Sequence, residues 1–269
     1  MAFSAETFQG RLRTARLGRS CRAVPETGST IDLAWEWVRE GAPHGAVVVA
    51  DAQTRGRGRL GRAWSSPEGG LWLSLIVWPD LPAEHAGRLG IALALATAQA
   101  VTEETGAATK VKWPNDVVLS GRKLGGVLVE TEMAEAKVTA AVLSLGLNAN
   151  VSLDALPAEV RGFAASLLDA TGRRFALETL AAGILGHLED AWPALYQADS
   201  SLVAAWQQTD ALAGQQVVVI SGGKPASAGE MGLRGVCAGI DNAGALVLLT
   251  PNGSQRITSG EVRSLRAAE

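Results

Sequence analysis

Apolar residues recur with helical spacing in four segments of the chain. Residues 31, 34, 35 and 38 are apolar within 31–39, which places them on one face of a helix. Ser29 or Thr30 can cap this helix, because a hydroxyl accepts a hydrogen bond from a free amide of the first turn. Similar spacing, or long runs of alanine and leucine, predicts helices over 84–105, 175–195 and 202–212, with Pro193 disturbing the end of the third.

Short β-branched or alternating runs lie between these helices. They predict strands over 46–50, 71–77, 109–113, 117–119, 121–130 and 138–148. In 71–77 the alternation places Leu71, Leu73 and Leu75 on one face and the residues between them on the other. Because meander strands occur together with separate long helices, the pattern favours an α+β fold over a parallel α/β sheet.

The composition changes near Gly214, after which short strands and turns dominate. Strands are predicted over 216–220, 233–240, 245–249 and 255–258, with turns at 241–244 and 251–253. This pattern is typical of a small β-barrel attached to a larger domain. We therefore expect two domains, residues 1–212 and residues 213–269.

Composition narrows the functional classes. The chain has 269 residues, of which 47% are hydrophobic and 19% charged, and its net charge of −3 argues mildly against a non-specific nucleic-acid binder. The two cysteines are far apart, so a reduced, cytoplasmic compartment fits best. The polar N-terminus lacks a signal-peptide core, and the longest apolar stretch, 91–101, is too short to span a bilayer. Three scattered histidines give little support to a histidine metal site.

A loop rich in arginine and glycine follows the strand at 46–50. It reads Gln53-Thr54-Arg55-Gly56-Arg57-Gly58-Arg59-Leu60-Gly61-Arg62-Ala63-Trp64. Glycines leave backbone amides open to a ligand, and arginines supply forked cationic donors, so the loop could wrap a carboxylate or phosphate. Taken alone, such a run is more often a solvated basic turn, and an RNA-contacting segment is a second alternative.

Three further motifs lie at strand ends. They are Lys112-Trp113-Pro114-Asn115-Asp116, then Lys123 before the adjacent glycines Gly125 and Gly126, and Gly146-Leu147-Asn148. Pro114 favours an extended Trp113, and paired glycines in a strand let a ligand or another backbone approach closely. Each motif has an ordinary alternative, namely an Asn-Asp turn beside a core tryptophan, a solvated turn lysine beside a bulge, and an asparagine that closes a turn.

The ordered set of these motifs resembles the catalytic core of biotin protein ligases. The set comprises Gly-Ser-Thr at 28–30, the arginine loop ending at Trp64, Leu-Trp-Leu-Ser at 71–74, KWPND at 112–116, RKLGGVLVE at 122–130 and Gly-Leu-Asn at 146–148. Order and spacing are similar to the family's over about residues 25–150, and the resemblance resumes at Gly260-Glu261-Val262. The pair of GRGRxGRxW and KWPND is specific, since lipoate ligases share the fold class but lack it.

The resemblance implies a fold and a two-step reaction. The fold would be a class II synthetase-like mixed sheet with helices packed on it, followed by a C-terminal SH3-like β-barrel. The first step would join the biotin carboxylate to the α-phosphate of ATP and release pyrophosphate. The second would pass the biotinyl group from biotinyl-5′-AMP to a lysine of a biotin carboxyl carrier domain of a carboxylase. Mg²⁺ is expected because phosphate charge needs a hard cation, whereas no protein-held metal site is expected.

The resemblance also implies roles for individual residues. The implied catalytic residues are Lys123, Asp116 and Arg57. The implied biotin-binding residues are Ser29, Thr30, Gln53, Gly56, Arg57, Gly58, Arg59, Ser74, Lys123, Gly125 and Gly126. The implied nucleotide-binding residues are Arg59, Arg62, Trp64, Lys112, Asn115 and Asn148. Lys123 would neutralise the carboxylate and the α-phosphate, and Asp116 would orient or deprotonate the acceptor lysine. We expect the loop at 53–70 to be mobile without ligand and to close over biotin.

Several points depart from the family pattern or stay open. Ile31 stands where the family usually carries asparagine, which puts a side-chain role there in doubt. The segment 261–266 has one extra residue, which leaves Arg263 and Arg266 as alternatives for the family's arginine. About twenty residues precede the matching core, too few for the DNA-binding winged helix of bifunctional members, so we expect no DNA binding. Because no apolar stretch is long enough to span a bilayer, we also expect no membrane association. The sequence is compatible with a monomer or a homodimer.

Three other functions are weaker alternatives. A ligase of the same fold that takes lipoate or octanoate is disfavoured by Gln53 and by KWPND. A nucleic-acid-binding module built on the arginines between Arg55 and Arg62 is disfavoured by the net negative charge and by the lack of aromatic residues within that run. A biotin-binding protein without catalysis is disfavoured because all the matched residues are present.

Overall fold

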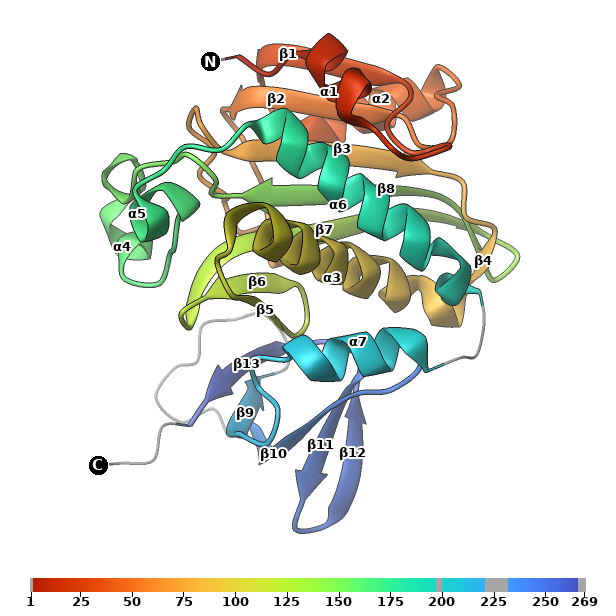
Figure 1. The fold of residues 1–269 in the computed structure, drawn as a ribbon. Coiled ribbons are helices and arrows are strands. Elements are labelled where there is room, and N and C mark those ends of the chain that lie inside the picture. The colour runs from red at the N-terminus through yellow and green to blue at the C-terminus, as the bar shows by residue number, and fades with distance from the viewer. Residues whose placement is uncertain (1, 197–199, 221–231, 266–269) are drawn as a thin grey trace.

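The chain forms one large mixed sheet and a smaller antiparallel sheet (Figure 1). The computed structural model describes residues 2–196, 200–220 and 232–265. The large sheet has the strand order β1-β2-β3-β8-β7-β6-β5, with β4 paired to β8. Only β1 and β2 run parallel among the paired strands described. The strands are β1 (Cys21–Thr27), β2 (Val47–Gln53), β3 (Leu71–Val77), β4 (Leu81–Pro82), β5 (Thr109–Lys112), β6 (Asp116–Leu119), β7 (Arg122–Ala134) and β8 (Lys137–Leu147).

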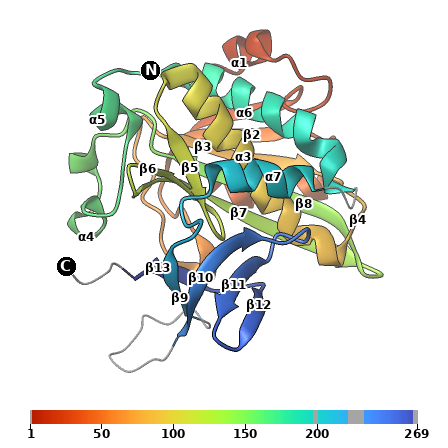
Figure 2. The same cartoon turned by 60° about the horizontal axis from the view of Figure 1, so that its bottom comes forward.

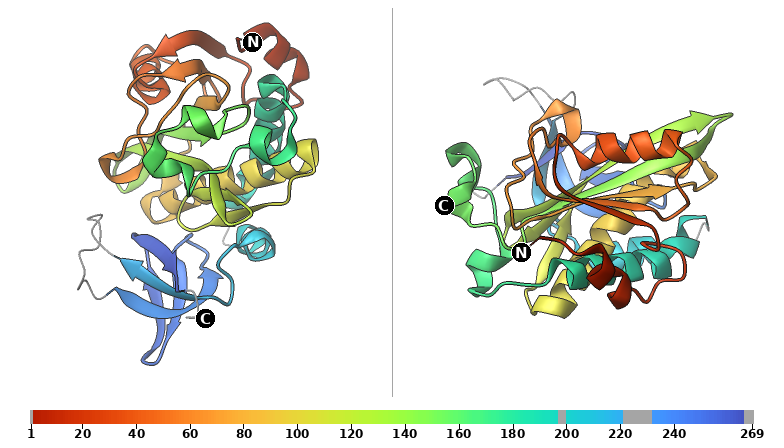
Figure 3. Two further views of the ribbon diagram at one scale, coloured as in Figure 1. Left: turned by 90° about the vertical axis from the view of Figure 1, so that its left-hand side faces the viewer. Right: turned by 90° about the horizontal axis from the view of Figure 1, so that it is seen from above.

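Helices cover both faces of the large sheet. One face packs on α1 (Ala5–Arg11), α3 (Ala86–Thr105) and α6 (Leu177–Ala191), and the other packs on α2 (Thr30–Arg39), as the view from above shows (Figure 3). Leu71, Leu73 and Leu75 belong to the core under α3, whereas Ile76 packs under α2. The alternation predicted for 71–77 is therefore confirmed.

Local signals in the sequence set the ends of the main helices. The hydroxyl of Ser29 accepts a hydrogen bond from the amide of Ile31, so Ser29 is the N-cap of α2. Gly106 ends α3 in the left-handed conformation, which glycine adopts without strain. The helix predicted over 175–195 ends at Ala191, and a 3-10 turn at Trp192–Leu195 contains Pro193, as expected.

The C-terminal region is a separate five-stranded sheet, joined to the large sheet through α7 (Ser201–Thr209) (Figure 2). Its antiparallel strands follow the order β12-β11-β10-β9-β13. They are β9 (Gln216–Ile220), β10 (Leu233–Ile240), β11 (Leu246–Thr250), β12 (Gly253–Ile257) and β13 (Glu261–Ser264). Separate C-terminal β-structure is confirmed, but β12 and β13 lie at the edges, so the described strands do not close into the predicted barrel. The boundary between residues 212 and 213 stays a prediction.

Several elements were not predicted from the sequence. They are α1, β1, β4, β13, the short helices α4 (Ala158–Arg161) and α5 (Leu167–Thr171), and the 3-10 turns at Arg59–Gly61, Ala83–His85 and Leu153–Ala155. β1 contains Pro25 and is largely exposed, so it has neither a continuous apolar run nor a strict alternation. Its pairing with β2 is a tertiary contact that local pattern does not encode. None of the helices described is both long and apolar enough to cross a bilayer.

A carboxylate on α6 anchors the segment between α1 and β1. Glu189 accepts hydrogen bonds from the backbone amides of Ala15, Arg16 and Leu17 at 2.5, 2.8 and 2.9 Å. Burial acts to raise the pKa of Glu189, but these three amides and the charge of Arg19 outweigh it, and the pKa is lowered. A depressed pKa means that the anchor stabilises the fold above the carboxyl's unfolded pKa and that this stability is lost as pH falls through the folded pKa.

Replacing this carboxylate is expected to destabilise the fold. Glu189→Gln exchanges one accepting oxygen for an NH₂ group that faces backbone donors, so we expect a loss of about 2 kcal/mol in unfolding free energy. The loss should be present at neutral pH and shrink as the pH falls toward the acid range, because the wild-type carboxylate then takes up a proton. Urea unfolding at several pH values measures it.

Asp190→Asn is the matched control, because Asp190 is the next residue on α6 and is exposed. We expect that variant to unfold within about 0.5 kcal/mol of the wild type. Equal stability of the Glu189→Gln variant at neutral pH would contradict the anchoring role.

Candidate active site

A row of cross-strand partners runs across the large sheet, and its members come from four of the sequence motifs. Trp72 on β3 pairs with Gly146 on β8, and Gly146 pairs with Gly126 on β7. Gly126 pairs in turn with Asp116 on β6, and Asp116 with Lys112 on β5. Directly paired residues point to the same face of a sheet. The register therefore brings these motifs together on the face that α2 partly covers.

The two paired glycines make room for Trp64, which ends the arginine loop. A Cβ at Gly146 would lie 2.5 Å from Trp64 Nε1, and a Cβ at Gly126 would lie 3.3 Å from Lys123 Nζ. The Trp64 ring meets Trp72 edge-on at 6.5 Å between centroids, and Lys123 Nζ lies 5.1 Å from the Trp64 ring centroid. The close approach of Trp64 thus requires glycine at position 146, whereas at position 126 a Cβ would press on the end of the Lys123 side chain and meet Trp64 only at an ordinary 3.6 Å.

Lys123 and Asp116 form an ion pair beside Trp64, with 2.6 Å between Lys123 Nζ and Asp116 Oδ1. The backbone of Lys123 is fixed on both sides, since its amide donates to Phe163 O and its carbonyl accepts from the amide of Ala165, each at 2.7 Å. Both side chains keep partial solvent exposure, 37% for Lys123 and 21% for Asp116. The pair is therefore held in place by rigid backbone while it stays within reach of a ligand.

Arg59 lies within electrostatic reach of this pair. Burial lowers the pKa of the Arg59 guanidinium, the charge of Asp116 opposes that shift, and the charge of Arg62 adds to it. A guanidinium stays protonated in spite of such a shift. The structure thus brings two cations, Lys123 and Arg59, toward the same carboxylate.

A chain of neutral hydrogen bonds lies beneath α2. The amide and hydroxyl of Thr30 both donate to Gln53 Oε1, at 2.8 and 3.1 Å. The Ser74 hydroxyl donates to Thr30 Oγ1 at 2.8 Å and lies 2.9 Å from the hydroxyl of Ser144. Gln53 Nε2 donates to Ser66 Oγ at 2.8 Å. These side chains form a polar group of donors and acceptors without net charge in an otherwise apolar layer.

Arg57 lies apart from the Lys123–Asp116 pair. Its NH1 is 2.7 Å from Asp32 Oδ1 and its Nε is 3.4 Å from Glu130 Oε1. Burial acts to lower the pKa of Arg57, but Asp32 and Glu130 outweigh it, and the pKa is raised. Glu130 follows Lys123 by seven residues on β7, roughly 20 Å along an extended strand. The catalytic role implied for Arg57 stays a prediction and requires the loop to move.

The arginine loop also touches the C-terminal sheet. Arg62 NH2 lies 2.6 Å from Glu261 Oε2, and Arg263 Nε lies 3.2 Å from Glu261 Oε1. Arg59 NH1 donates to the carbonyl of Gly260 at 3.4 Å. Of the two arginines left open by the sequence, Arg263 therefore pairs with Glu261, and Arg266 lies outside the described residues.

The remaining predicted residues have structural partners of their own. Asn115 Nδ2 donates to Val127 O at 2.6 Å and joins the β5–β6 turn to β7. Asn148 Nδ2 donates to Ala165 O at 3.0 Å, while Asn148 Oδ1 is buried with no hydrogen-bond partner among the described residues. Trp64 Nε1 is likewise buried and has no hydrogen-bond partner among the described residues. Asn148 and Trp64 thus offer one acceptor and one donor that a bound ligand could satisfy.

Backbone positions complete the predicted site. A Cβ at Gly56 would lie 2.5 Å from Trp64 O, and one at Gly125 would lie 2.8 Å from Gly146 O, so glycine is needed at both. Gly58 has open space, since a Cβ there would lie 3.8 Å from Arg62 O, so the fold itself does not require glycine at that position.

Two side chains at the site were missed in the sequence. Ser144 pairs directly with Ser74 across β3 and β8, and a cross-strand partner cannot be identified before the register is known. Phe163 is 76% exposed, and its carbonyl accepts the amide of Lys123. An exposed aromatic residue whose backbone bonds to that of Lys123 stands out only once residues 151–166 are placed in three dimensions.

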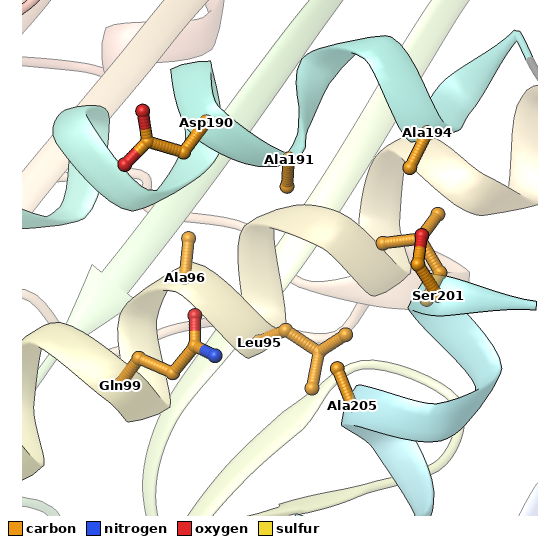
Figure 4. Close-up of a pocket in the computed structure, with 9 residues that line it drawn as sticks. Leu95, Ala96, Gln99, Asp190, Ala191, Ala194, Ser201 and Ala205 are labelled. Carbon is orange, nitrogen blue, oxygen red and sulfur yellow. The ribbon is translucent and has the colours of Figure 1, made fainter.

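A separate cavity lies far from these residues, between α3, α6 and α7 (Figure 4). It has a volume of about 230 Å³ and is lined mostly by alanine and leucine, with Gln99 and Asp190 at its exposed side. None of the residues predicted for catalysis or binding lines it. We assign it no role in the chemistry.

Comparisons with known proteins agree with the geometry. Residues 24–148 match the Biotin/lipoate A/B protein ligase family, and residues 213–263 match the Biotin protein ligase C terminal domain. The biotin--[acetyl-CoA-carboxylase] ligase of Mycobacterium tuberculosis is 32% identical over 92% of this chain and 90% of its own length. The bifunctional ligase/repressor BirA of Bacillus subtilis is 32% identical over 93% of this chain and 76% of its own length.

Solved structures show the same fold. A biotin protein ligase from Aquifex aeolicus in complex with biotin and ATP superposes with a TM-score of 0.76 at 28% identity, over 93% of this chain and all of that one. A biotin protein ligase from Leishmania major in complex with biotinyl-5-AMP superposes with a TM-score of 0.63 at 21% identity, over 89% of this chain and 99% of that one. At 21% identity, the likeness to the Leishmania major structure supports the fold alone.

Loss of the Glu261 carboxylate is expected to loosen the arginine loop. Burial acts to raise the pKa of Glu261, but Arg62 and Arg263 outweigh it and lower the pKa, so the carboxylate is charged at neutral pH. Half-exposed ion pairs of this kind contribute up to ~1 kcal/mol, so Glu261→Gln should raise trypsin cleavage within 55–62 by about two- to fivefold. Mass spectrometry of timed digests measures it.

Glu104→Gln, an exposed position on α3, serves as the control and should leave cleavage unchanged. Identical digestion of the Glu261→Gln variant and the wild type would mean that Glu261 does not hold the loop.

Proposed function

Since the chain belongs to the Biotin/lipoate A/B protein ligase family, we propose that it activates biotin with ATP and transfers the biotinyl group to a lysine of a biotin carboxyl carrier domain. It is a ligase enzyme by this membership. The observation that carries the proposal is the Lys123–Asp116 pair on a sheet surface cleared by Gly126 and Gly146 and bordered by the arginine loop. The Aquifex aeolicus relative binds both biotin and ATP.

The first step needs cations between two anions. A biotin carboxylate oxygen attacks the α-phosphorus of ATP, a P–O bond forms, and pyrophosphate leaves with the electrons of the broken bond. Lys123 Nζ pairs with Asp116, and the charge of Asp116 also acts on the Arg59 guanidinium, so both cations would reduce the repulsion between carboxylate and phosphate. Fixed cations in a partly desolvated site stabilise charge in the transition state without reorganising.

The biotin head group suits the neutral hydrogen-bond chain beneath α2. A ureido ring carries two N–H donors and one carbonyl acceptor and has no charge. Thr30, Gln53 and Ser74 supply hydroxyl and amide groups of both kinds and no charge. We propose that the ring binds there and that the valeryl chain runs along the sheet toward Lys123.

Three features support our proposal for the part of the site that binds the nucleotide. The indole N–H of Trp64 and Oδ1 of Asn148 have no partner among the described residues. Phe163 is 76% exposed, and its backbone carbonyl accepts the amide of Lys123, so we propose that its ring offers a flat apolar surface for a base. Arg62, Lys112 and Asn115 remain proposed contacts to the nucleotide.

The second step uses Asp116. The acceptor lysine must lose a proton before its amine attacks the biotinyl carbonyl and AMP departs. Asp116 lies on the same sheet surface as Lys123 and would orient the incoming ammonium or accept its proton.

Mg²⁺ belongs to the proposal as a companion of ATP. No group of three or more acidic, histidine or cysteine side chains able to hold a metal occurs among the described residues. Mg²⁺ commonly binds through substrate phosphates and one or two carboxylates, so a preformed cage is unnecessary. Asp116 is the carboxylate of the Lys123 pair and would complete the coordination of a phosphate-bound ion.

Other features of the proposal concern location and partners. Cys21 and Cys237 are free thiols, which supports a reduced, cytoplasmic compartment. The Bacillus subtilis relative is named a ligase/repressor, and the expectation that this chain does not bind DNA stays a prediction that a gel-shift assay tests.

Biotin-dependent exchange of labelled pyrophosphate into ATP tests the first step directly. We expect exchange with biotin and none with lipoate or octanoate, because the neutral chain beneath α2 recognises a ureido ring that the other acids lack. Exchange with lipoate instead of biotin would reassign the substrate. Absence of exchange with every acid, from folded protein, would overturn the proposed function.

Replacement of Lys123 tests the catalytic assignment. Lys123→Ala should lower the rate of adenylation by ~10²–10³ while the fold remains, because one preorganised charge at the transition state is lost. Lys137→Ala is a matched control, since Lys137 pairs with Asp80 at 3.1 Å far from the site. Near-wild-type turnover of Lys123→Ala would remove Lys123 from the catalytic residues.

A further inference from the structure

The turn between β10 and β11 makes a close contact with α3, the helix packed on the large sheet. A Cβ at Gly87 on α3 would lie 3.0 Å from the carbonyl of Ala243, and a Cβ at Gly244 would lie 3.1 Å from Ile91 Cγ1. Gly244 has a φ of +82°, a conformation that side chains with a Cβ rarely adopt. Glycines on both sides thus allow the turn at 241–244 to approach α3 at backbone distance.

Two donors from the large sheet region hold this turn. Trp113 Nε1 donates to Gly244 O at 3.0 Å, and the buried guanidinium of Arg88 donates to Asn242 O. Trp113 is only 2% exposed and Arg88 only 3% exposed. The turn itself is rigid, because Asp241 Oδ1 accepts from the amides of Ala243 and Ala245, each at 2.9 Å.

Trp113 belongs to the KWPND motif, three residues before Asp116. The β5–β6 turn that contains it is held on the other side by Asn115, which donates to Val127 O and accepts from the amide of Val127. Asp116 follows directly and pairs with Lys123. The turn that carries Asp116 is therefore fixed between β7 of the large sheet and Gly244 of the C-terminal sheet.

We propose that Trp113 is a positioning residue, through which the 241–244 turn of the C-terminal sheet sets the place of Asp116 and so of the Lys123–Asp116 pair. Trp113 is buried, and its indole N–H donates to Gly244 O. Its effect on the reaction passes through Asp116. The inference rests on the proposed function for its kinetic test, though not for its structural one.

The test compares two variants, each of which lacks one hydrogen bond from a tryptophan indole N–H to a backbone carbonyl. Trp113→Phe removes the donor to Gly244 O, and Trp78→Phe removes the donor from Trp78 Nε1 to Ala42 O, also at 3.0 Å, in a loop remote from the site. We expect Trp113→Phe to lower kcat for biotinylation of a carrier domain roughly 10-fold, because small displacements of reacting groups slow the reaction strongly. KM for biotin should stay unchanged, since Thr30, Gln53 and Ser74 lie on α2, β2 and β3.

Hydrogen exchange gives a second measurement that does not depend on catalysis. In Trp113→Phe the amides of Val127 and of residues 243–245 should exchange faster than in the wild type, whereas in Trp78→Phe they should not. The proposal would be overturned if kcat were equal in Trp113→Phe and the wild type, or if KM for biotin rose by the same factor by which kcat fell. If the wild type itself shows no biotin-dependent turnover, the proposed function fails, and the exchange data still decide whether Trp113 couples the two turns.

A second pair of variants covers the case in which Trp113→Phe does not fold. Gly87→Ala places a methyl group 3.0 Å from Ala243 O, while Gly90→Ala on the same helix meets only Val129 Cγ2 at 3.6 Å. We expect Gly87→Ala to lower kcat and to speed exchange at 243–245, and Gly90→Ala to do neither. Equal behaviour of the two variants would overturn the proposal.

Discussion

The site depends on the register of the large sheet. Trp72, Gly146, Gly126 and Asp116 share one lateral row across four strands, and only in that register do the paired glycines lie beneath Trp64. A slip of one residue in any of these strands would turn its members toward α3, because side chains alternate between faces. The apolar residues between them, which pack under α3, therefore fix the site as firmly as they fix the core.

Electrostatics explains how an arginine-rich site exists in a chain with a net negative charge. Three cations of the site have acidic ion-pair partners: Lys123 with Asp116, Arg57 with Asp32 and Glu130, and Arg62 with Glu261. Substrate anions would have to exchange with these carboxylates and not simply add to free cations. The Arg57 and Arg62 pairs are partly exposed, and such pairs contribute up to ~1 kcal/mol each, so exchange of the loop arginines between two sets of partners requires little free energy.

Much of the site could be predicted because its motifs are local. The strand at 71–77, the helix cap at Ser29 and the Lys123 motif carry their signals in adjacent residues, and the structure places them as expected or close to it. Ser144 and Phe163 could not be found, because a cross-strand partner and an exposed aromatic ring are properties of tertiary placement. β1 was missed for the same reason, since a largely exposed strand containing Pro25 is stabilised by pairing with β2 and not by its own pattern. Strand patterns likewise predicted the C-terminal β-structure, but the barrel expected from them does not close among the described strands, because the pairing of the edge strands β12 and β13 is a tertiary property.

The C-terminal sheet contacts the site from two directions. Gly260 and Glu261 hold the arginine loop, whose Trp64 lies beside Lys123, and Gly244 accepts a hydrogen bond from Trp113 in the turn before Asp116. Both contacts join segments more than a hundred residues apart in sequence, so neither can form before the two sheets dock. Because the turn at 241–244 meets α3 at backbone distance and through buried donors, that contact is the rigid one. The contact at Glu261 is made by long, half-exposed side chains. Docking at Gly244 can therefore persist while the loop opens and closes against Glu261, which separates the positioning of Asp116 from the movement of the arginines.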